Sequence, residues 1–307
     1  MVLSPKRYKT ASLDWEEREM NVTLAAASAN FGRDLEENYA TIARLLADAR
    51  TQGAALLALP EATLGGYLSS LGGPGDPRKP KSLPPALRLD GPELARVISM
   101  AGETIIVLGI CEAYGPENKL VRYNTAVALN GTGILGLHRK VHQPLGENMS
   151  YDPGSEFAAF ESPIGRMGLL ICQDKAFPEA ARSLALDDAA VIVCISAWPG
   201  SRTGSTADLQ EDRWTKRFTI FDQARALENQ VVWVASNQSG TFGSLRYVGN
   251  AKIVSPGGEI LATTGVDEGL AVASVDVAGS LATARRAMFY LGDRRPELYR
   301  VKSVAHA

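Results

Sequence analysis

Short apolar runs alternate with amphipathic segments along most of this 307-residue chain, and this alternation limits the folds that it can adopt. Residues 21–28 and 54–60 have the composition of buried strands. Residues 34–53 between them place apolar side chains at helical spacing, and Gly53 follows as a natural stop. Strands that alternate with helices in this way favour a layered α/β architecture over a β-sandwich or a helix bundle.

The same patterns continue toward the C-terminus. Further helices are expected at residues 92–101, 177–189 and 211–229, and further strands at 104–113, 125–130, 134–140, 157–162, 166–172, 190–196, 231–236, 248–254, 259–263 and 270–277. The Asn-Gly-Thr-Gly sequence at residues 130–133 is a hairpin signal. Because no segment has the composition of a linker, we predict one domain over residues 21–307, preceded by a polar extension over residues 1–20.

Composition and charge argue against several classes of function. Hydrophobic residues make up 45% of the chain, which is enough to bury a sizeable core. The net charge of −2 gives no electrostatic basis for binding nucleic acid or an acidic membrane. We find no apolar stretch typical of a signal peptide and none long enough to span a bilayer. With three cysteines and no CxxC pair, we expect a reduced, cytoplasmic protein.

Histidine is scarce, which limits the mechanisms open to the chain. Only His138, His142 and His306 are present, and His306 is the next-to-last residue. A Ser-His-Asp or Cys-His mechanism would therefore have to use one of the first two. A zinc site would have few ligands to draw on.

Cys172 differs from the other two cysteines in its position. Cys111 and Cys194 lie inside apolar strand segments, where free thiols are usually buried and inert. Cys172 closes the run 166–172 and is followed by polar residues and then a helix. Such a strand end is where α/β proteins bind ligands, and nearby backbone N–H groups can lower a thiol pKa and receive an oxyanion. The alternative is a buried cysteine without a function.

Two other charged residues also follow apolar strands directly. Partial desolvation of Glu61 would raise its pKa toward that of a general base, and the ammonium of Lys140 could stabilise an oxyanion or a thiolate. Taken alone, each is more simply a solvated group, as is Glu147 in the loop after Lys140. Taken together, converging strand ends would supply a thiol nucleophile, a base and an oxyanion-stabilising cation without any histidine.

These segments resemble the nitrilase superfamily of carbon–nitrogen hydrolases. The resemblance is carried by LALPEATLGGY around Glu61, HRKVHQPLGENMSYDPG around Lys140 and Glu147, and GRMGLLICQDKAFPEAAR around Cys172. Looser support comes from QARALENQVVWVASNQSG, VGNAKIVSPGGEILA and RRPELY, so the likeness covers residues 21–299. The three main segments in this order are specific, whereas any one of them alone would be weak.

The resemblance implies a fold and a set of catalytic residues. The fold is a four-layer α-β-β-α sandwich that pairs into a homodimer or a higher homo-oligomer, with no cofactor and no metal. The site is a Glu-Lys-Cys triad with a second glutamate, carried here by Glu61, Lys140, Cys172 and Glu147. In that scheme Glu61 is the base, Lys140 and the backbone N–H of Gln173 stabilise the oxyanion, and Glu147 orients the substrate or its charged neighbours.

The sequence constrains the substrate less tightly. Nitrilases proper tend to carry Trp-Glu after the nucleophile, whereas Gln173 and Asp174 are nearer to the pattern of amidases and carbamoyl-amide hydrolases. We therefore predict a small amide or N-carbamoyl substrate. Lys175 could pair with a substrate carboxylate or be a solvated lysine. Tyr67 and Trp198 could line the substrate pocket or be ordinary packing residues.

Three other interpretations stay open at this point. A nitrilase would use the same triad to convert a nitrile into an acid and ammonia. A non-catalytic interaction protein could keep the same fold, although the presence of all four site residues argues against it. A thiol redox protein could use Cys172, although no resolving cysteine is near it in the sequence.

Overall fold

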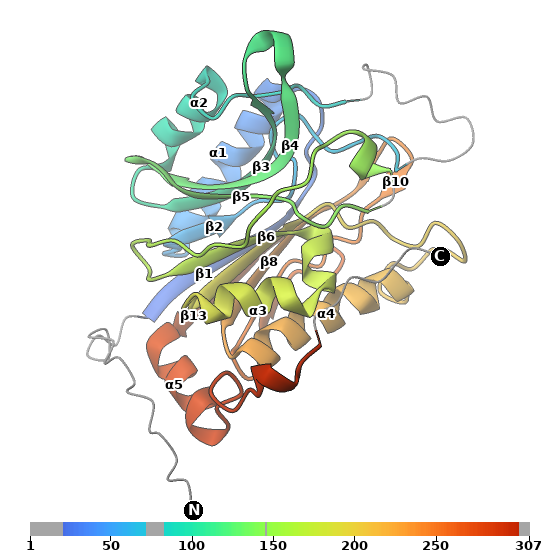
Figure 1. Ribbon diagram of the computed structural model, residues 1–307. Helices are drawn as coiled ribbons and strands as arrows, with labels where there is room; N and C mark the ends of the chain where they lie inside the picture. The colour runs from blue at the N-terminus through green and yellow to red at the C-terminus, as the bar shows by residue number, and fades with distance from the viewer. Residues whose placement is uncertain (1–20, 72–82, 145, 301–307) are drawn as a thin grey trace, which may run out of the picture.

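Two groups of strands pack face to face at the centre of the protein (Figure 1). The structure, a computed structural model, describes residues 21–71, 83–144 and 146–300. The extension predicted at residues 1–20 lies outside the described residues, so the proposed domain boundary stays a prediction.

The first group of strands has the order β13–β1–β2–β3–β4–β5. Its members are β1 (Asn21–Ala29), β2 (Leu56–Ala58), β3 (Ile105–Tyr114), β4 (Val121–Asn130), β5 (Gly133–Arg139) and β13 (Gly269–Asp276). Strands β1, β2 and β3 are parallel, and the outer strands join them antiparallel. The hairpin predicted at residues 130–133 connects β4 to β5 and is confirmed.

The second group has the order β6–β7–β8–β11–β12. Its members are β6 (Met167–Ile171), β7 (Val191–Ser196), β8 (Val232–Gln238), β11 (Lys252–Val254) and β12 (Ile260–Thr263). Strands β6, β7 and β8 are parallel, so their C-terminal ends meet at one edge. β8 also pairs with β1 over two residues, which makes the two groups one hydrogen-bonded sheet that folds over on itself. A separate short hairpin joins β9 (Thr241–Phe242) and β10 (Leu245–Arg246).

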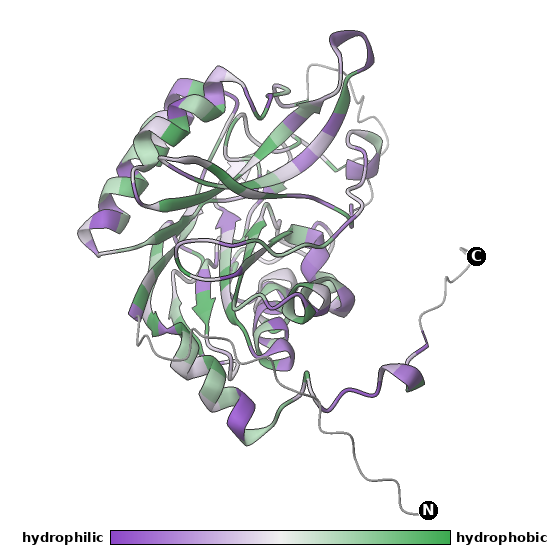
Figure 2. Ribbon diagram, turned by 60° about the vertical axis from the view of Figure 1, so that its left-hand side comes forward, coloured by the Kyte–Doolittle hydropathy of each residue, from purple (hydrophilic) through white to green (hydrophobic). Residues whose placement is uncertain are grey.

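Helices cover both outer faces of the strands (Figures 1 and 2). The helices are α1 (Leu35–Thr51), α2 (Pro92–Ala101), α3 (Pro178–Leu186), α4 (Arg213–Asn229) and α5 (Val277–Ala287). Asp34 caps α1 by accepting two backbone N–H groups, and Asp212 caps α4 in the same way with one. Proline begins α2 and α3, where its missing N–H costs no helical hydrogen bond.

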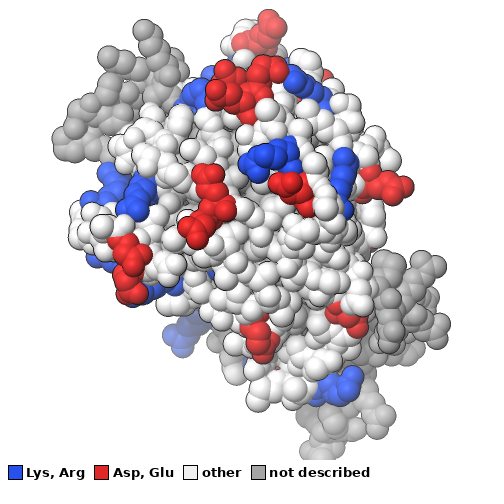
Figure 3. Space-filling model, turned by 180° about the vertical axis from the view of Figure 1, so that it is seen from behind, with Lys and Arg blue, Asp and Glu red and all other residues white. Residues whose placement is uncertain are grey.

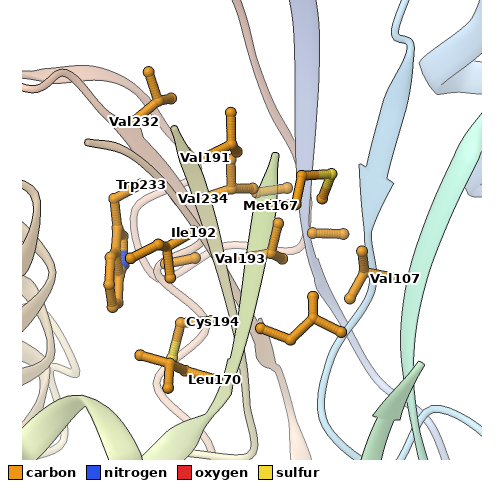
Figure 4. Packing of buried hydrophobic residues seen from close by; sticks show 14 of the residues in the cluster. Val107, Met167, Leu170, Val191, Ile192, Val193, Cys194, Val232, Trp233 and Val234 are labelled. Carbon is orange, nitrogen blue, oxygen red and sulfur yellow. The ribbon is translucent and has the colours of Figure 1, made fainter. Parts of the chain in front are cut away.

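Alternate side chains of β1 enter two different hydrophobic clusters. Ala25 and Ala27 pack with residues of α1 and α2, whereas Leu24 and Ala26 belong to the cluster that also contains β6 and β7. Figure 4 shows the same alternation on β7, where Val193 points toward Val107 and its neighbours point the other way. Helices α3 and α4 cover that other face. The four-layer α-β-β-α sandwich is therefore confirmed.

Two segments differ from the sequence prediction. Residues 157–162 do not form a strand and contain only an isolated bridge between Phe160 and Met167. The ring of Phe160 packs so closely on Gly136 that a Cβ there would lie 2.4 Å from it. This packing and the two backbone hydrogen bonds between Phe160 and Met167 hold the segment. Helix α5, with Leu281 buried, follows β13 where no helix was expected, because its small and charged residues give only a weak apolar pattern.

Acidic and basic side chains are interspersed among uncharged ones on the face shown in Figure 3. This distribution agrees with the small net charge of −2 and offers no extended basic surface on that face. Within the described residues, no helix combines the length and the apolar character needed to cross a membrane.

Candidate active site

Three charged side chains meet beside the C-terminal ends of β2 and β5. Nζ of Lys140 lies 2.7 Å from Oε1 of Glu61 and 2.7 Å from Oε2 of Glu147. All three side chains are fully buried. A buried ammonium is tolerated when carboxylates form charge-assisted hydrogen bonds with it, and this geometry supplies two. The structure thus brings together three of the four residues predicted for the site.

Asn124 of β4 joins the two carboxylates to each other. Its Nδ2 atom donates to Oε1 of Glu61 and to Oε1 of Glu147, each over 2.6 Å. The hydroxyl of Tyr67 donates to Oε2 of Glu147 over 2.7 Å. Tyr67, which was predicted as a possible pocket wall, therefore contacts a carboxylate of the cluster. These hydrogen bonds fix the orientation of both glutamates around Lys140.

The backbone around Glu61 is held in a tight turn. Ala62 has a φ of +58°, in the left-handed region, and Gly109 of β3 packs directly against it. A Cβ at Gly109 would lie only 2.3 Å from the nitrogen of Ala62. The N–H of Ala197 donates to Oε2 of Glu61 over 2.6 Å, and the side chain of Gln238 donates to the carbonyl of Glu61 over 3.0 Å. The segments that follow β2 and β7 and the last residue of β8 therefore meet at Glu61.

Cys172 follows β6 and begins the short 3₁₀ helix η4 (Cys172–Ala176). Its φ of +49° is unusual for a residue other than glycine and costs of order 1–3 kcal/mol. Only 5% of the residue is exposed. The carboxylate of Asp174 accepts the N–H of Ile171 over 3.1 Å and so closes the turn around the thiol.

Both described histidines bind Asp174. Nε2 of His138 lies 2.9 Å from Oδ2, and the backbone nitrogen and Nδ1 of His142 lie 2.9 and 3.0 Å from Oδ1. Burial acts to raise the pKa of Asp174, but the hydrogen bonds from the two histidines outweigh it and keep the pKa below its usual value. Because these histidines flank Lys140 in the sequence, Asp174 links the Cys172 turn to the segment that carries the ammonium.

Burial and charge act together on the ionisable groups. Burial raises the pKa of the Cys172 thiol well above its usual value and Glu61 adds to the effect, whereas Lys140 and Lys175 oppose it. Burial acts to lower the pKa of Lys140, but Glu147 and Glu61 outweigh it and hold that pKa well above its usual value. Burial also raises the pKa of Glu147. Before substrate binds, the site therefore favours a protonated Cys172 thiol beside a protonated Lys140 ammonium.

The remaining predicted substrate contacts lie in different surroundings. Gln173 is partly exposed directly after Cys172. Lys175 is fully buried, so the alternative of a solvated lysine is wrong, and its Nζ lies 2.8 Å from Oδ1 of Asp222. Its ammonium is thus bound to a carboxylate of the protein. Trp198 is also buried, and its indole N–H donates to the carbonyl of Trp214 over 3.2 Å.

Several residues around the site were missed by sequence reasoning. Asn124 and Gly109 lie inside strands, where nothing in the sequence marks their contacts with Glu61. Asp222 lies in α4 at the spacing of the buried positions Phe218 and Arg225, and this pattern could have indicated a buried carboxylate. In the part of the chain that the structure describes, no group of three or more His, Cys, Asp or Glu residues is placed to hold a metal ion.

Comparisons with known proteins give the family. Residues 23–285 match the family model described as carbon–nitrogen hydrolase. The chain belongs to this carbon–nitrogen hydrolase family. Among curated relatives of this hydrolase, N-carbamoylputrescine amidase from Solanum lycopersicum is 30% identical and aligns over 93% of this chain and 96% of its own. A nitrilase from Pyrococcus abyssi is 31% identical over 79% of this chain and 84% of its own.

Solved structures agree with this family. The amidase from Nesterenkonia sp. AN1 superposes on this hydrolase with a TM-score of 0.72 at 25% identity, covering 92% of this chain and 96% of that chain. That structure is of a mutant showing covalent addition of the acetamide moiety of fluoroacetamide at the active site cysteine. A carbon–nitrogen hydrolase from Helicobacter pylori has the same fold, with a TM-score of 0.77 at 22% identity. The chain is thus an enzyme of the nitrilase superfamily.

Proposed function

We propose that this carbon–nitrogen hydrolase cleaves a small amide or N-carbamoyl compound through a thioester on Cys172. The observation that carries the proposal is the buried contact of Lys140 with Glu61 and Glu147, which places a fixed cation and a proton acceptor within electrostatic range of a strained, buried thiol. The N-carbamoylputrescine amidase and the amidase of known structure, both similar along most of the chain, support an amide substrate.

Acylation begins with transfer of the Cys172 proton to the Glu61 carboxylate. The sulfur then forms a bond to the substrate carbonyl carbon, and the carbonyl electron pair moves to oxygen. Lys140 and the backbone N–H of Gln173 stabilise this oxyanion. When the intermediate collapses, the C–N bond breaks and the leaving nitrogen takes the proton from Glu61. Ammonia or an amine departs, and an acyl thioester remains.

Deacylation repeats these steps with water. Glu61 takes a proton from the water, whose oxygen attacks the thioester carbonyl. Collapse of the second intermediate breaks the C–S bond, and the thiol regains its proton from Glu61. Asn124 and Ala197 have a clear part in this scheme, because their hydrogen bonds aim the carboxylate that handles each proton. Glu147 holds the other side of Lys140 and keeps the ammonium pointed at the site.

A nitrile substrate is the second candidate. The nitrilase from Pyrococcus abyssi is as similar to this chain as the amidase relative, and a thiolate can attack a nitrile carbon with the same three residues. The Gln173-Asp174 sequence after the thiol favours the amide. The two candidates differ in the substrates that release ammonia.

The experiment that tests the proposal is ammonia release by the wild type and by Cys172→Ala. The panel contains short aliphatic amides, aromatic amides, N-carbamoyl amines, N-carbamoyl amino acids and matched nitriles. Cys172-dependent release from an amide or carbamoyl group supports the proposal, and release from nitriles alone selects the second candidate. Full activity of Cys172→Ala would remove the thiol from the mechanism. Cys194→Ala is the matched control, because Cys194 is a buried thiol within a strand.

We also propose that the protein acts in the cytoplasm as a homodimer or a larger homo-oligomer. All three cysteines are free thiols, which suits a reducing compartment. Leu186 of α3 and Ile220 and Leu227 of α4 are exposed apolar side chains that a second subunit could cover. Light scattering of the purified protein tests the oligomeric state, and a monomer at micromolar concentration contradicts it.

A further inference from the structure

Behind the Cys172 turn, two lysines share one carboxylate in the interior of the protein. Nζ of Lys175 lies 2.8 Å from Oδ1 of Asp222, and Nζ of Lys252 lies 2.9 Å from Oδ2. All three side chains have zero exposure. The indole of Trp233 also donates to Oδ1 of Asp222 over 3.0 Å, and the carbonyl of Asn250 accepts from Lys252 over 2.7 Å. We call Lys175, Asp222 and Lys252 the rear cluster.

The rear cluster carries an excess positive charge. Burial lowers the pKa of Lys252 to about 8, although Asp222 opposes this shift. Below about pH 8, two ammonium groups and one carboxylate therefore leave one unit of positive charge in a buried place, which is costly. The ring of Phe218 accounts for part of the stabilisation, since Nζ of Lys175 and of Lys252 lie 3.0 and 4.2 Å from its centroid. An aromatic ring does not neutralise a full charge, so the remaining positive charge creates an electrostatic potential at the neighbouring buried groups.

The group of Glu61, Glu147 and Lys140 carries the opposite excess when both glutamates are ionised. One ammonium and two carboxylates leave one unit of negative charge, and this charge opposes formation of a thiolate at Cys172. Lys140 and Lys175 are the two cations whose charges favour that thiolate. Cys172 therefore lies within range of two charge groups of opposite sign.

The rear cluster is fixed to the same turn as the thiol. Lys175 belongs to η4, which Cys172 begins, and Arg225 of α4 donates to the carbonyl of Lys175 over 2.8 Å. Asp222 lies one helical turn before Arg225. Helix α4 therefore contacts Lys175 at its ammonium, through Asp222, and at its backbone carbonyl, through Arg225. Other titratable groups also lie around the cluster and the thiol: Cys194, Asp174, His138, His142, Glu228, Tyr67 and Tyr247.

We propose that the rear cluster supplies the positive charge that stabilises the Cys172 thiolate when Glu61 takes the thiol proton. Its lysines touch neither substrate nor the reacting atoms, so they are positioning residues that act through the field at the sulfur. The proposal rests on Cys172 being the nucleophile, and it gives Lys175 an electrostatic task in place of the substrate contact predicted from the sequence.

The test replaces the whole rear cluster by apolar side chains in the variant Lys175→Met/Asp222→Leu/Lys252→Met. Replacing a buried ionic triad by apolar residues of similar volume is often neutral or stabilising, so we expect this variant to fold with at least wild-type stability. The rate of Cys172 alkylation by iodoacetamide is measured between about pH 6 and pH 10, with the modified residue identified by mass spectrometry. Below about pH 8, where Lys252 is protonated, we expect the alkylation rate of the variant to be about tenfold lower than that of the wild type, equivalent to about one pH unit. Above about pH 8 we expect the difference to narrow, because Lys252 of the wild type then loses its charge.

Turnover gives the second readout. We expect kcat for an amide to fall about tenfold while KM stays within about twofold, because the substrate does not contact the cluster. Lys252→Met alone leaves a neutral Lys175–Asp222 pair and should move both readouts in the same direction. Lys216→Met is the control, because it removes an exposed lysine of α4 that pairs with Glu211, and its profiles should overlay those of the wild type.

The alkylation and turnover measurements have outcomes that would overturn the proposal. A folded triple variant with wild-type alkylation and kcat would overturn the proposal and leave the cluster a structural role. If the triple variant does not fold, Lys252→Met takes its place, and an unchanged rate of Cys172 alkylation in that variant would also overturn the proposal. Full amide hydrolysis by Cys172→Ala would instead show that the proposed function itself is wrong, so the two failures are distinguishable.

Discussion

Nδ2 of Asn124 lies 2.6 Å from Oε1 of Glu61, the oxygen that also accepts the Lys140 ammonium. The other oxygen of Glu61 is occupied by the N–H of Ala197. Three donors thus hold this carboxylate, and its freedom to rotate is small. A base held in this way keeps its direction toward the thiol between the two half-reactions.

Asn124→Leu tests this arrangement. Leucine keeps the approximate volume and removes both hydrogen bonds to Glu61 and Glu147. Because hydrogen bonds to charged groups contribute about 1.5–3 kcal/mol each, we expect kcat/KM to fall by about 10- to 100-fold while the protein stays folded. Steady-state kinetics with circular dichroism checks this. Asn130→Leu, in the hairpin of the same strand, is the control, and equal kinetic losses in both variants would contradict a specific role for Asn124.

Glu61→Gln separates base chemistry from shape. Glutamine keeps the size of the side chain but accepts no proton from the thiol, so we expect acylation to slow by at least about 100-fold. Single-turnover mass spectrometry with an amide substrate shows whether the thioester forms. Rapid accumulation of acyl-enzyme in this variant would assign the first proton transfer to another group. Glu93→Gln, on the surface of α2, should behave as the wild type.

The sequence allows prediction of the strand-end residues because apolar runs stop at them. Glu61 and Cys172 each follow a buried strand whose neighbours are parallel, so they lie at C-terminal strand ends, where such sheets bind ligands. Lys140 follows β5, an only partly buried outer strand that pairs antiparallel with β4. Helices with a clear 3.6-residue pattern were likewise predictable, as at residues 92–101, which match α2 at both ends. Helix α5 lacked such a pattern and was missed.

The contacts that support the site could not be predicted in the same way. Lys252 lies 30 residues from Asp222 along the chain, and only the packing of β11 on α4 brings their charges together. A lysine in the apolar segment 248–254 indicates burial but names no partner. From the sequence, Lys175 could either pair with a substrate carboxylate or be solvated, whereas its ammonium lies 2.8 Å from Asp222 of α4.

Gly109→Ala should disturb Glu61 without touching any charged group. The new Cβ would lie 2.3 Å from the backbone nitrogen of Ala62, and backbone cannot yield as a flexible side chain can. Overpacking of this kind costs about 1–3 kcal/mol of stability, and a displaced base can lose about 100-fold in kcat. Calorimetry and kinetics measure the two effects. At Gly32 a Cβ meets nothing within 4 Å, so Gly32→Ala should be nearly silent. Wild-type kcat in Gly109→Ala would mean that the turn tolerates the methyl group.

The lowered pKa of Asp174 leads to a prediction of how the free energy of unfolding depends on pH. Its pKa in the folded protein lies below the usual 3.8, because the histidine hydrogen bonds outweigh burial. Because the pKa of this carboxyl is lower in the folded protein than in the unfolded chain, its charge stabilises the fold at pH values above the unfolded pKa. This stabilisation is lost as the pH falls from the unfolded pKa toward the folded pKa. We therefore expect Asp174→Asn to lose about 3 kcal/mol at neutral pH and to differ less from the wild type below about pH 4.

Urea unfolding at several pH values measures this difference. Asp90→Asn is the matched control, because Asp90 is an exposed carboxylate paired with Arg88, and it should change the unfolding free energy by less than about 1 kcal/mol at any pH. A loss in Asp174→Asn that is the same at pH 3 and pH 7 would mean that the carboxylate acts through its shape and neutral hydrogen bonds. The charge-assisted contacts with His138 and His142 would then contribute little to holding the Cys172 turn in place.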